Sequence, residues 1–157
     1  MDCGNAVGGV IAPDLFNKLN IHLNQIYCDV DPDFPNHHPD PTVDENLKDL
    51  SKFVIKNKCD LGIAYDGDAD RIVAVDENGE IVRSDILISL FVADIINEND
   101  SVVYDVKCSK ALEDTINKFK GRPVLCKTGH SHIKNKMQET KSKVGGEMSG
   151  HIFFADK

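Results

Sequence analysis

The chain has 157 residues, which suits one ordinary domain or two small ones, and its 41% hydrophobic content is enough for a core. A formal net charge of −8 argues against a nucleic-acid partner, which would require clustered Lys and Arg. No apolar run approaches the roughly 18 residues of a membrane span, so no membrane partner is expected.

The cysteines and the first residues of the chain bear on the cellular compartment in which the protein is expected. Five cysteines are widely scattered and none forms a C-x-x-C pair, so neither a disulfide framework nor a zinc ribbon is expected. The first residues lack the charged-then-apolar pattern of a signal peptide. We therefore expect a cytoplasmic protein with reduced thiols.

The first third of the chain predicts short elements joined by turns. Residues 2–9 resemble the end of a strand that enters a glycine-rich turn, and 10–19 predict a helix with one apolar face. A short strand is predicted over 26–30, followed by a proline-rich surface loop over 31–41. Residues 44–56 then predict an amphipathic helix whose acidic first turn suits the helix dipole.

The stretch 66–71, Asp-Gly-Asp-Ala-Asp-Arg, carries the strongest chemical signal. Its three carboxylates are spaced i, i+2 and i+4, so an extended segment points them to one side; they are Asp66, Asp68 and Asp70. At about 4 Å and an effective dielectric near 20, each pair would repel by about 4 kcal/mol, which a hard divalent cation converts into coordination. The pattern predicts one Mg²⁺ per site, with Arg71 placed to hold a phosphate beside the metal.

Two other interpretations of this stretch remain open. In a calcium loop of the EF-hand type, Glu77 would fall at the twelfth position, but Arg71 occupies the sixth position, which requires Gly. The flanking segments 60–65 and 72–76 also read as strands rather than as helices. The second alternative is a solvated acidic turn without a metal.

A second unit of alternating helices and strands is predicted from Ser84 onward. The expected helices are 85–96, 109–119 and 133–139, and the expected strands are 101–106, 123–127 and 152–154. Such alternation with short connections indicates a parallel sheet covered by helices. Residues 127–132 lie where the strand 123–127 meets the helix 133–139, at the edge where open α/β sheets bind ligands.

The stretch 145–151, Gly-Gly-Glu-Met-Ser-Gly-His, is a second candidate binding loop. Glu147 and Ser149 alternate, so both can face one ligand, and together they offer the acceptors and the donor that suit neighbouring sugar hydroxyls. The flanking glycines allow close backbone approach. The alternative is an ordinary glycine-containing turn.

Three segments together resemble the α-D-phosphohexomutase family, in its bacterial phosphomannomutase/phosphoglucomutase branch. They are Asp66 to Arg71, Lys127 to Ser131 and Glu147 to His151, and the segments 2–5, 34–41 and 105–109 also match. The resemblance implies two consecutive small α/β units with mixed sheets covered by helices. Residues 1–84 would be domain 2 with its metal-binding loop, and 85–157 would be domain 3 with its sugar-binding loop, incomplete at its carboxyl end.

The resemblance also implies an activity and the residues that perform it. Members of the family interconvert hexose 1-phosphate and 6-phosphate, of mannose or glucose, through a phosphoserine and a bisphosphate intermediate. By resemblance, the three aspartates bind Mg²⁺, Arg71 stabilises the transferring phosphoryl group and His151 is the acid/base candidate. The implied substrate-binding residues are Lys107, His130, Glu147 and Ser149.

One departure from the family limits what the chain is expected to do. No Ser-His-Asn-Pro stretch resembling the family's phosphoserine loop occurs, and the Ser131-His132 pair is followed by Ile133. The phosphoserine-bearing and carboxyl-terminal domains are therefore expected elsewhere, in cis or in trans, and the chain alone is expected to be inactive. Two alternatives are a non-catalytic module that binds Mg²⁺ and a sugar phosphate, and a metal-dependent phosphatase with Asp66 as nucleophile.

Overall fold

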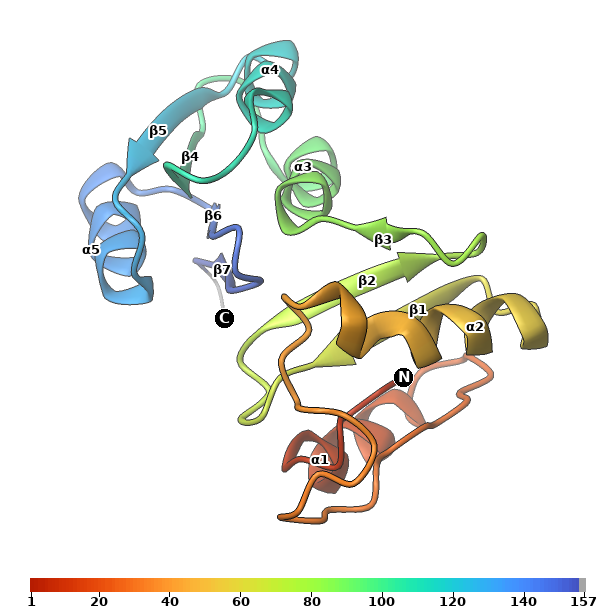
Figure 1. Cartoon of the computed structure of the whole chain (residues 1–157). Helices are drawn as coiled ribbons and strands as arrows, with labels where there is room; N and C mark the ends of the chain where they lie inside the picture. The colour runs from red at the N-terminus through yellow and green to blue at the C-terminus, as the bar shows by residue number, and fades with distance from the viewer. Residues whose placement is uncertain (156–157) are drawn as a thin grey trace. The chain divides into compact units, whose positions relative to one another are not determined.

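The computed structural model describes residues 1–155 of the chain and divides into two compact units, Met1–Val82 and Arg83–Lys157 (Figure 1). Each unit combines a small sheet with helices, so the predicted α/β fold class is confirmed. Within the described residues, no helix has the length and apolar character needed to cross a membrane.

The sheet of the first unit is antiparallel in the order β1-β2-β3. Its strands are β1 (Leu61–Tyr65), β2 (Ile72–Asp76) and β3 (Ile81–Val82). Isolated parallel bridges join Asp2 to Ala64 of β1 and to Ile26, so the first residues of the chain lie beside β1. The strand predicted over 26–30 is reduced to this one bridge, because Tyr27 adopts a left-handed φ of 52°, which interrupts an extended run.

One face of this sheet is covered by helix α2 (Lys48–Asn57), which follows the 3-10 turn η1 (Asp44–Leu47). The helix predicted over 44–56 is therefore confirmed, except that its first turn is 3-10. The buried cluster under α2 consists of Leu47, Leu50, Val54, Ala64, Val73 and Val75. Because residues alternate along a strand, every second side chain of β1 faces this cluster.

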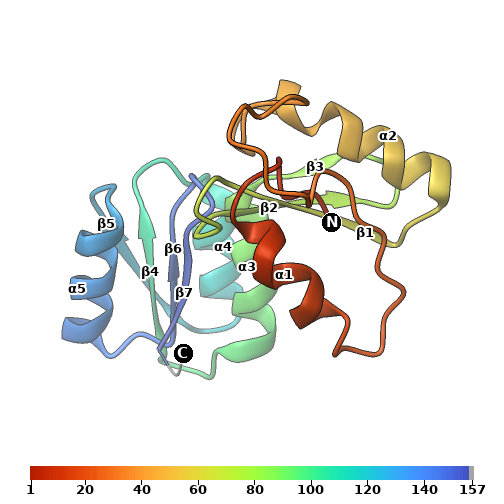
Figure 2. The same cartoon turned by 90° about the horizontal axis from the view of Figure 1, so that it is seen from below.

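Helix α1 (Gly8–Phe16) lies on the other side of the sheet from α2 (Figure 2). The helix predicted over 10–19 starts and ends earlier than expected, and its predicted apolar face is exposed, since Ile11, Leu15 and Leu19 are 71%, 55% and 53% exposed. The helix instead packs through its first turn, where a Cβ at Gly8 would lie 3.2 Å from the Cβ of Ala69. Glycine therefore allows the start of α1 to approach the acidic loop closely.

The sheet of the second unit has the order β5-β4-β6-β7. Its strands are β4 (Ser101–Asp105), β5 (Arg122–Cys126), β6 (Val144–Gly146) and β7 (Ile152–Phe154). β4 pairs in parallel with both β5 and β6, whereas β7 is antiparallel to β6. The parallel core that the alternation predicted is present, so three strand carboxyl ends meet at one edge of the sheet.

Helices cover both faces of this sheet (Figure 2). α3 (Ser84–Ile95) and α4 (Lys110–Lys118) lie on one face and α5 (His130–Thr140) lies on the other. Val102 and Tyr104 of β4 pack in the cluster of α3 and α4, whereas Val103 between them packs with α5. This alternation explains why β4 is apolar on both faces and fully buried.

Strand β6 was not foreseen, because its two glycines read as part of a binding loop. A Cβ at Gly145 would lie 2.5 Å from Met137 Sδ of α5, and one at Gly146 would lie 2.6 Å from Ile88 Cδ1 of α3. Both helices therefore approach this central strand too closely for a side chain. The glycines serve helix packing, and the loop begins only at Glu147.

Candidate functional site

The acidic loop connects β1 to β2 and gathers three carboxylates. One carboxylate oxygen each from Asp66, Asp68 and Asp70 lies within 4.8 Å of the others. Asp66 is buried and the other two are exposed. Ala69 has a left-handed φ of 61°, and its N–H donates to the Asp66 carbonyl at 3.1 Å, which turns the chain back on itself. This set of oxygen donors fits a hard divalent cation.

Arg71 is held at the end of this loop by two carboxylates. Its Nε lies 2.7 Å from Asp66 Oδ2 and its backbone N–H donates to Asp66 Oδ1 at 3.0 Å. Its NH1 lies 3.1 Å from Asp40 Oδ1, and its side chain remains 24% exposed. A guanidinium fixed in this way is oriented before any ligand arrives and still reaches solvent.

The EF-hand interpretation of the loop does not fit the geometry. Glu77, the residue at the twelfth position, follows the last residue of β2, whereas the acidic loop precedes its first residue. A strand of five residues separates the two by about 17 Å. Glu77 therefore cannot ligate an ion held by the three aspartates.

Asp40 is a member of this site that sequence reasoning missed. In addition to its ion pair with Arg71, its Oδ1 accepts hydrogen bonds from the Thr42 hydroxyl at 2.7 Å and from the Thr42 N–H at 3.1 Å. Burial opposes its ionisation, but these hydrogen bonds and the Arg71 guanidinium hold the pKa of Asp40 below its ordinary value. Its position between Pro39 and Pro41 was the available signal, because two fixed φ angles present the carboxylate rigidly.

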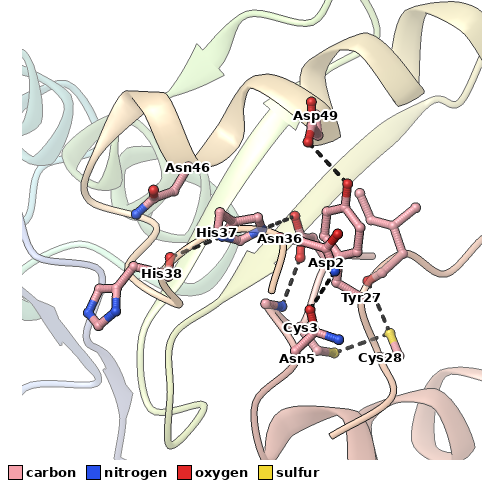
Figure 3. A network of polar contacts seen from close by, with 12 residues as sticks. Asp2, Cys3, Asn5, Tyr27, Cys28, Asn36, His37, His38, Asn46 and Asp49 are labelled. Carbon is pink, nitrogen blue, oxygen red and sulfur yellow. Dashed lines mark hydrogen bonds and ion pairs between the residues drawn. The ribbon is translucent and has the colours of Figure 1, made fainter. Parts of the chain in front are cut away.

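A buried carboxylate anchors the loop that carries Asp40 (Figure 3). Asp2 is fully buried, and its Oδ1 accepts the Gly4 N–H at 2.8 Å. Its Oδ2 lies 3.1 Å from His37 Nε2, while His37 Nδ1 lies 3.0 Å from the His38 carbonyl. Both ring nitrogens thus face acceptors, which favours the doubly protonated imidazolium. The hydrogen bond to Asp2 raises the pKa of His37, although burial opposes it.

This contact predicts a pH dependence of stability in the first unit. Because the pKa of His37 is raised on folding, its contribution is fully present below the unfolded value of about 6.5 and is lost as pH rises through the folded value. We expect the free energy of unfolding to fall over that window in the wild type and to fall less in His37→Gln. Urea unfolding between pH 5.5 and 8.5 measures both; the exposed His22→Gln serves as control. Equal slopes for His37→Gln and wild type would contradict the assignment.

In the second unit, the sequence-predicted residues gather at the carboxyl edge of the parallel strands. Lys107 follows β4, His130 begins α5 after β5, and Glu147 follows β6. Lys107 and His130 are exposed, whereas Glu147 is only 1% exposed. The predicted ligand edge of the sheet therefore collects residues from three separate strand ends.

Glu147 makes contacts within the protein rather than facing solvent. One of its oxygens accepts the Gly129 N–H, and the other lies 2.9 Å from His151 Nδ1. Ser149 Oγ lies 3.1 Å from the same nitrogen, and the His130 and His151 ring centres are 5.9 Å apart. Glu147 thus connects the loop before α5 to His151 and fixes the orientation of this imidazole.

Asp105, at the end of β4, is a second residue that sequence reasoning missed. It is fully buried, and its Oδ2 accepts the Thr128 hydroxyl at 2.8 Å. Its Oδ1 accepts the Met148 N–H and the Cys108 thiol, each at 3.2 Å. A single carboxylate therefore connects all three loops of the edge. The signal in the sequence was an acidic residue ending an otherwise apolar strand.

Comparisons with known proteins agree with these two units. A family model described as phosphoglucomutase/phosphomannomutase, alpha/beta/alpha domain II, matches residues 1–79, and the model of domain III matches 83–157. The phosphomannomutase/phosphoglucomutase of Pseudomonas aeruginosa is 49% identical over 159 aligned residues, which cover 100% of this chain and 34% of that protein. The chain thus spans about a third of the length of the curated relatives it matches first.

Solved structures of related proteins also match nearly the whole chain. A phosphoglucomutase/phosphomannomutase family protein from Burkholderia thailandensis superposes with a TM-score of 0.95 at 41% identity, covering 99% of this chain and 34% of that one. An N-acetylphosphoglucosamine mutase from Aspergillus fumigatus, in complex with GlcNAc-6P and magnesium, gives a TM-score of 0.69 at 22% identity. That alignment covers 99% of this chain and 36% of the other, and it shows similarity of fold.

Proposed function

The chain belongs to the phosphoglucomutase/phosphomannomutase family, and we propose that it is part of an enzyme that interconverts hexose 1-phosphate and hexose 6-phosphate. The observation that carries this proposal is the cluster of Asp66, Asp68 and Asp70 beside the oriented Arg71. Positioning and charge stabilisation are what phosphoryl transfer requires from a protein. Mannose and glucose phosphates are both candidate substrates.

We assign metal and phosphate binding to the first unit. The three aspartates would hold Mg²⁺, the ion found with GlcNAc-6P in the Aspergillus relative. When bound, the ion supplies positive charge that neutralises phosphate oxygens. Arg71 would contact the transferring phosphoryl group, and the Asp66 and Asp40 carboxylates hold its guanidinium in place for that contact.

We assign sugar-phosphate binding and proton transfer to the second unit. Lys107 and His130 are exposed at the ligand edge, where they would bind the phosphosugar. The Glu147 contact at His151 Nδ1 directs that proton toward the carboxylate and makes Nε2 the atom that would exchange a proton with a sugar hydroxyl. Ser149 would bind a hydroxyl, and Glu147 would act on the sugar chiefly through His151.

We further propose that the phosphoserine is supplied from outside these 157 residues. The family's Ser-His-Asn-Pro loop has no counterpart in the sequence, and the relatives are about three times as long. A phosphoryl group would pass from that serine to the hexose phosphate, and the resulting bisphosphate would return its other phosphate. The second candidate is a non-catalytic module that binds Mg²⁺ and sugar phosphate, for which the acidic cluster and the exposed Lys107 and His130 would serve equally.

A chimera distinguishes the two candidates. This chain would replace the matching segment of the Pseudomonas aeruginosa relative, and coupled phosphoglucomutase and phosphomannomutase assays would follow turnover. The mutase proposal expects activity from the chimera and none from the chain alone. A folded chimera that binds hexose phosphate without turnover would support the binding module instead.

The metal site is tested on the chain itself. We expect Asp68→Asn to weaken Mg²⁺ binding about tenfold or more, because one of three charged ligands is lost from the cluster. Isothermal titration with Mg²⁺ measures this affinity. The matched control is Glu77→Gln, which removes one nearby negative charge beyond reach of the ion and should bind as wild type. Equal weakening in both variants would mean that the ion responds to net charge rather than to a site.

A further inference from the structure

Two cysteines far apart in the sequence lie in contact in the first unit (Figure 3). The Sγ atoms of Cys3 and Cys28 are 3.4 Å apart. Cys3 is fully buried and Cys28 is partly exposed. Neither thiol takes part in the function proposed above, so the pair needs an explanation of its own.

The backbone holds these two cysteines in register. The Cys3 N–H donates to the Ile26 carbonyl at 3.4 Å, and the Asn5 N–H donates to the Tyr27 carbonyl at 2.7 Å. The Asn5 side chain also donates to the Asp29 carbonyl at 2.8 Å. Hydrogen bonds therefore flank both sulfurs, which lie 3.4 Å apart and would be about 2 Å apart in a disulfide.

We propose that Cys3 and Cys28 form a thiol–disulfide exchange site that reacts with small-molecule disulfides, with Cys28 as the attacking thiol and Cys3 as the resolving thiol. The site is independent of the mutase function. It qualifies the expectation that the thiols of this chain are reduced.

The two steps balance without a further reactant. The Cys28 thiolate attacks one sulfur of the small disulfide, whose S–S bond breaks, and a mixed disulfide forms while one small thiolate leaves. The Cys3 thiol then attacks Cys28 Sγ, the bond from Cys28 to the small molecule breaks, and the Cys3 proton passes to the second small thiolate as it leaves. The protein has lost two hydrogens and is oxidised to a disulfide, and the small disulfide is reduced to two thiols.

The environments of the two sulfurs explain why Cys28 attacks first and Cys3 second. The side-chain contact with the Cys3 sulfur lowers the pKa of Cys28, although partial burial opposes the shift. The same interaction, together with burial, raises the pKa of Cys3. Exposure and thiolate character both favour attack at Cys28, while the buried Cys3 can reach only a sulfur that is already adjacent.

The test is reaction of the reduced chain with glutathione disulfide at pH 7, followed by acid quenching, intact mass measurement and peptide mapping. The wild type should lose the mass of two hydrogens and give a peptide pair linked through Cys3 and Cys28. Cys3→Ala should accumulate a glutathione adduct at Cys28, and Cys28→Ser should form neither product. The adduct at Cys28 should form about tenfold faster than any adduct at Cys59, which is also partly exposed.

The matched control is Cys59→Ser, which should form the same disulfide at the wild-type rate. If Cys3→Ala does not fold, as circular dichroism would show, the wild type and Cys28→Ser still decide the result. The proposal is overturned if the wild type keeps a glutathione adduct without the crosslink, links other cysteines or does not react.

Discussion

Replacing Asp105 with Ala is expected to lower the free energy of unfolding of the second unit by about 3 kcal/mol. The carboxylate accepts the Thr128 hydroxyl, the Met148 N–H and the Cys108 thiol in a fully buried position. Each donor left without an acceptor there costs about 1 kcal/mol or more. Urea unfolding measures the total, and hydrogen exchange at β4 and β6 localises the loss to this unit.

A matched surface variant separates this effect from the loss of a charge. Asp114→Ala removes a carboxylate of α4 that forms an exposed ion pair with Lys110 at 3.6 Å. Surface pairs of this kind contribute about 0–1 kcal/mol, so Asp114→Ala should be nearly neutral. If both variants lost the same stability, Asp105 would not be the residue that holds the three loops.

Elements with a clear period were predictable from the sequence. The strands over 61–65 and 72–76 and the helices α3 and α4 lie within one or two residues of their predicted bounds. Their apolar residues recur with the period of a strand or a helix, and this period can be recognised within a short stretch of sequence. Two of the stretches that failed, 26–30 and β6, depend on distant contacts: a bridge from Ile26 to Asp2, and helices packed against Gly145 and Gly146.

In the candidate site, too, features set by neighbouring residues were predictable and features set by distant contacts were not. The acidic loop was predictable because its three carboxylates are close in sequence and their repulsion demands a partner. Asp40 and Asp105 were not, because each acts on residues more than 20 positions away, such as Arg71 and Thr128. For Glu147, nothing in its neighbouring residues indicated that a buried contact with Gly129 would occupy its carboxylate.

Replacing Arg71 with Met is expected to make the stability of the first unit depend on Mg²⁺ more strongly than in the wild type. Asp66 is buried beside two exposed carboxylates, and the Arg71 guanidinium contacts it with Nε 2.7 Å from Oδ2. Without that cation, the ion-free variant should lose about 2 kcal/mol, less than for a fully buried pair because Arg71 is 24% exposed. An ion bound by the three aspartates would stabilise the native state and restore most of this loss.

Thermal unfolding with and without Mg²⁺ measures the loss of stability in the ion-free variant and its recovery when the ion binds. The control is Arg122→Met, which replaces an exposed arginine at the start of β5. The gain in Tm on adding Mg²⁺ should be larger for Arg71→Met than for the wild type or Arg122→Met. A variant that is destabilised but gains nothing from Mg²⁺ would mean that the guanidinium is needed to assemble the carboxylates. If the variant is as stable as the wild type without Mg²⁺, Arg71 does not relieve the repulsion in this loop, and the cluster needs no cation to fold.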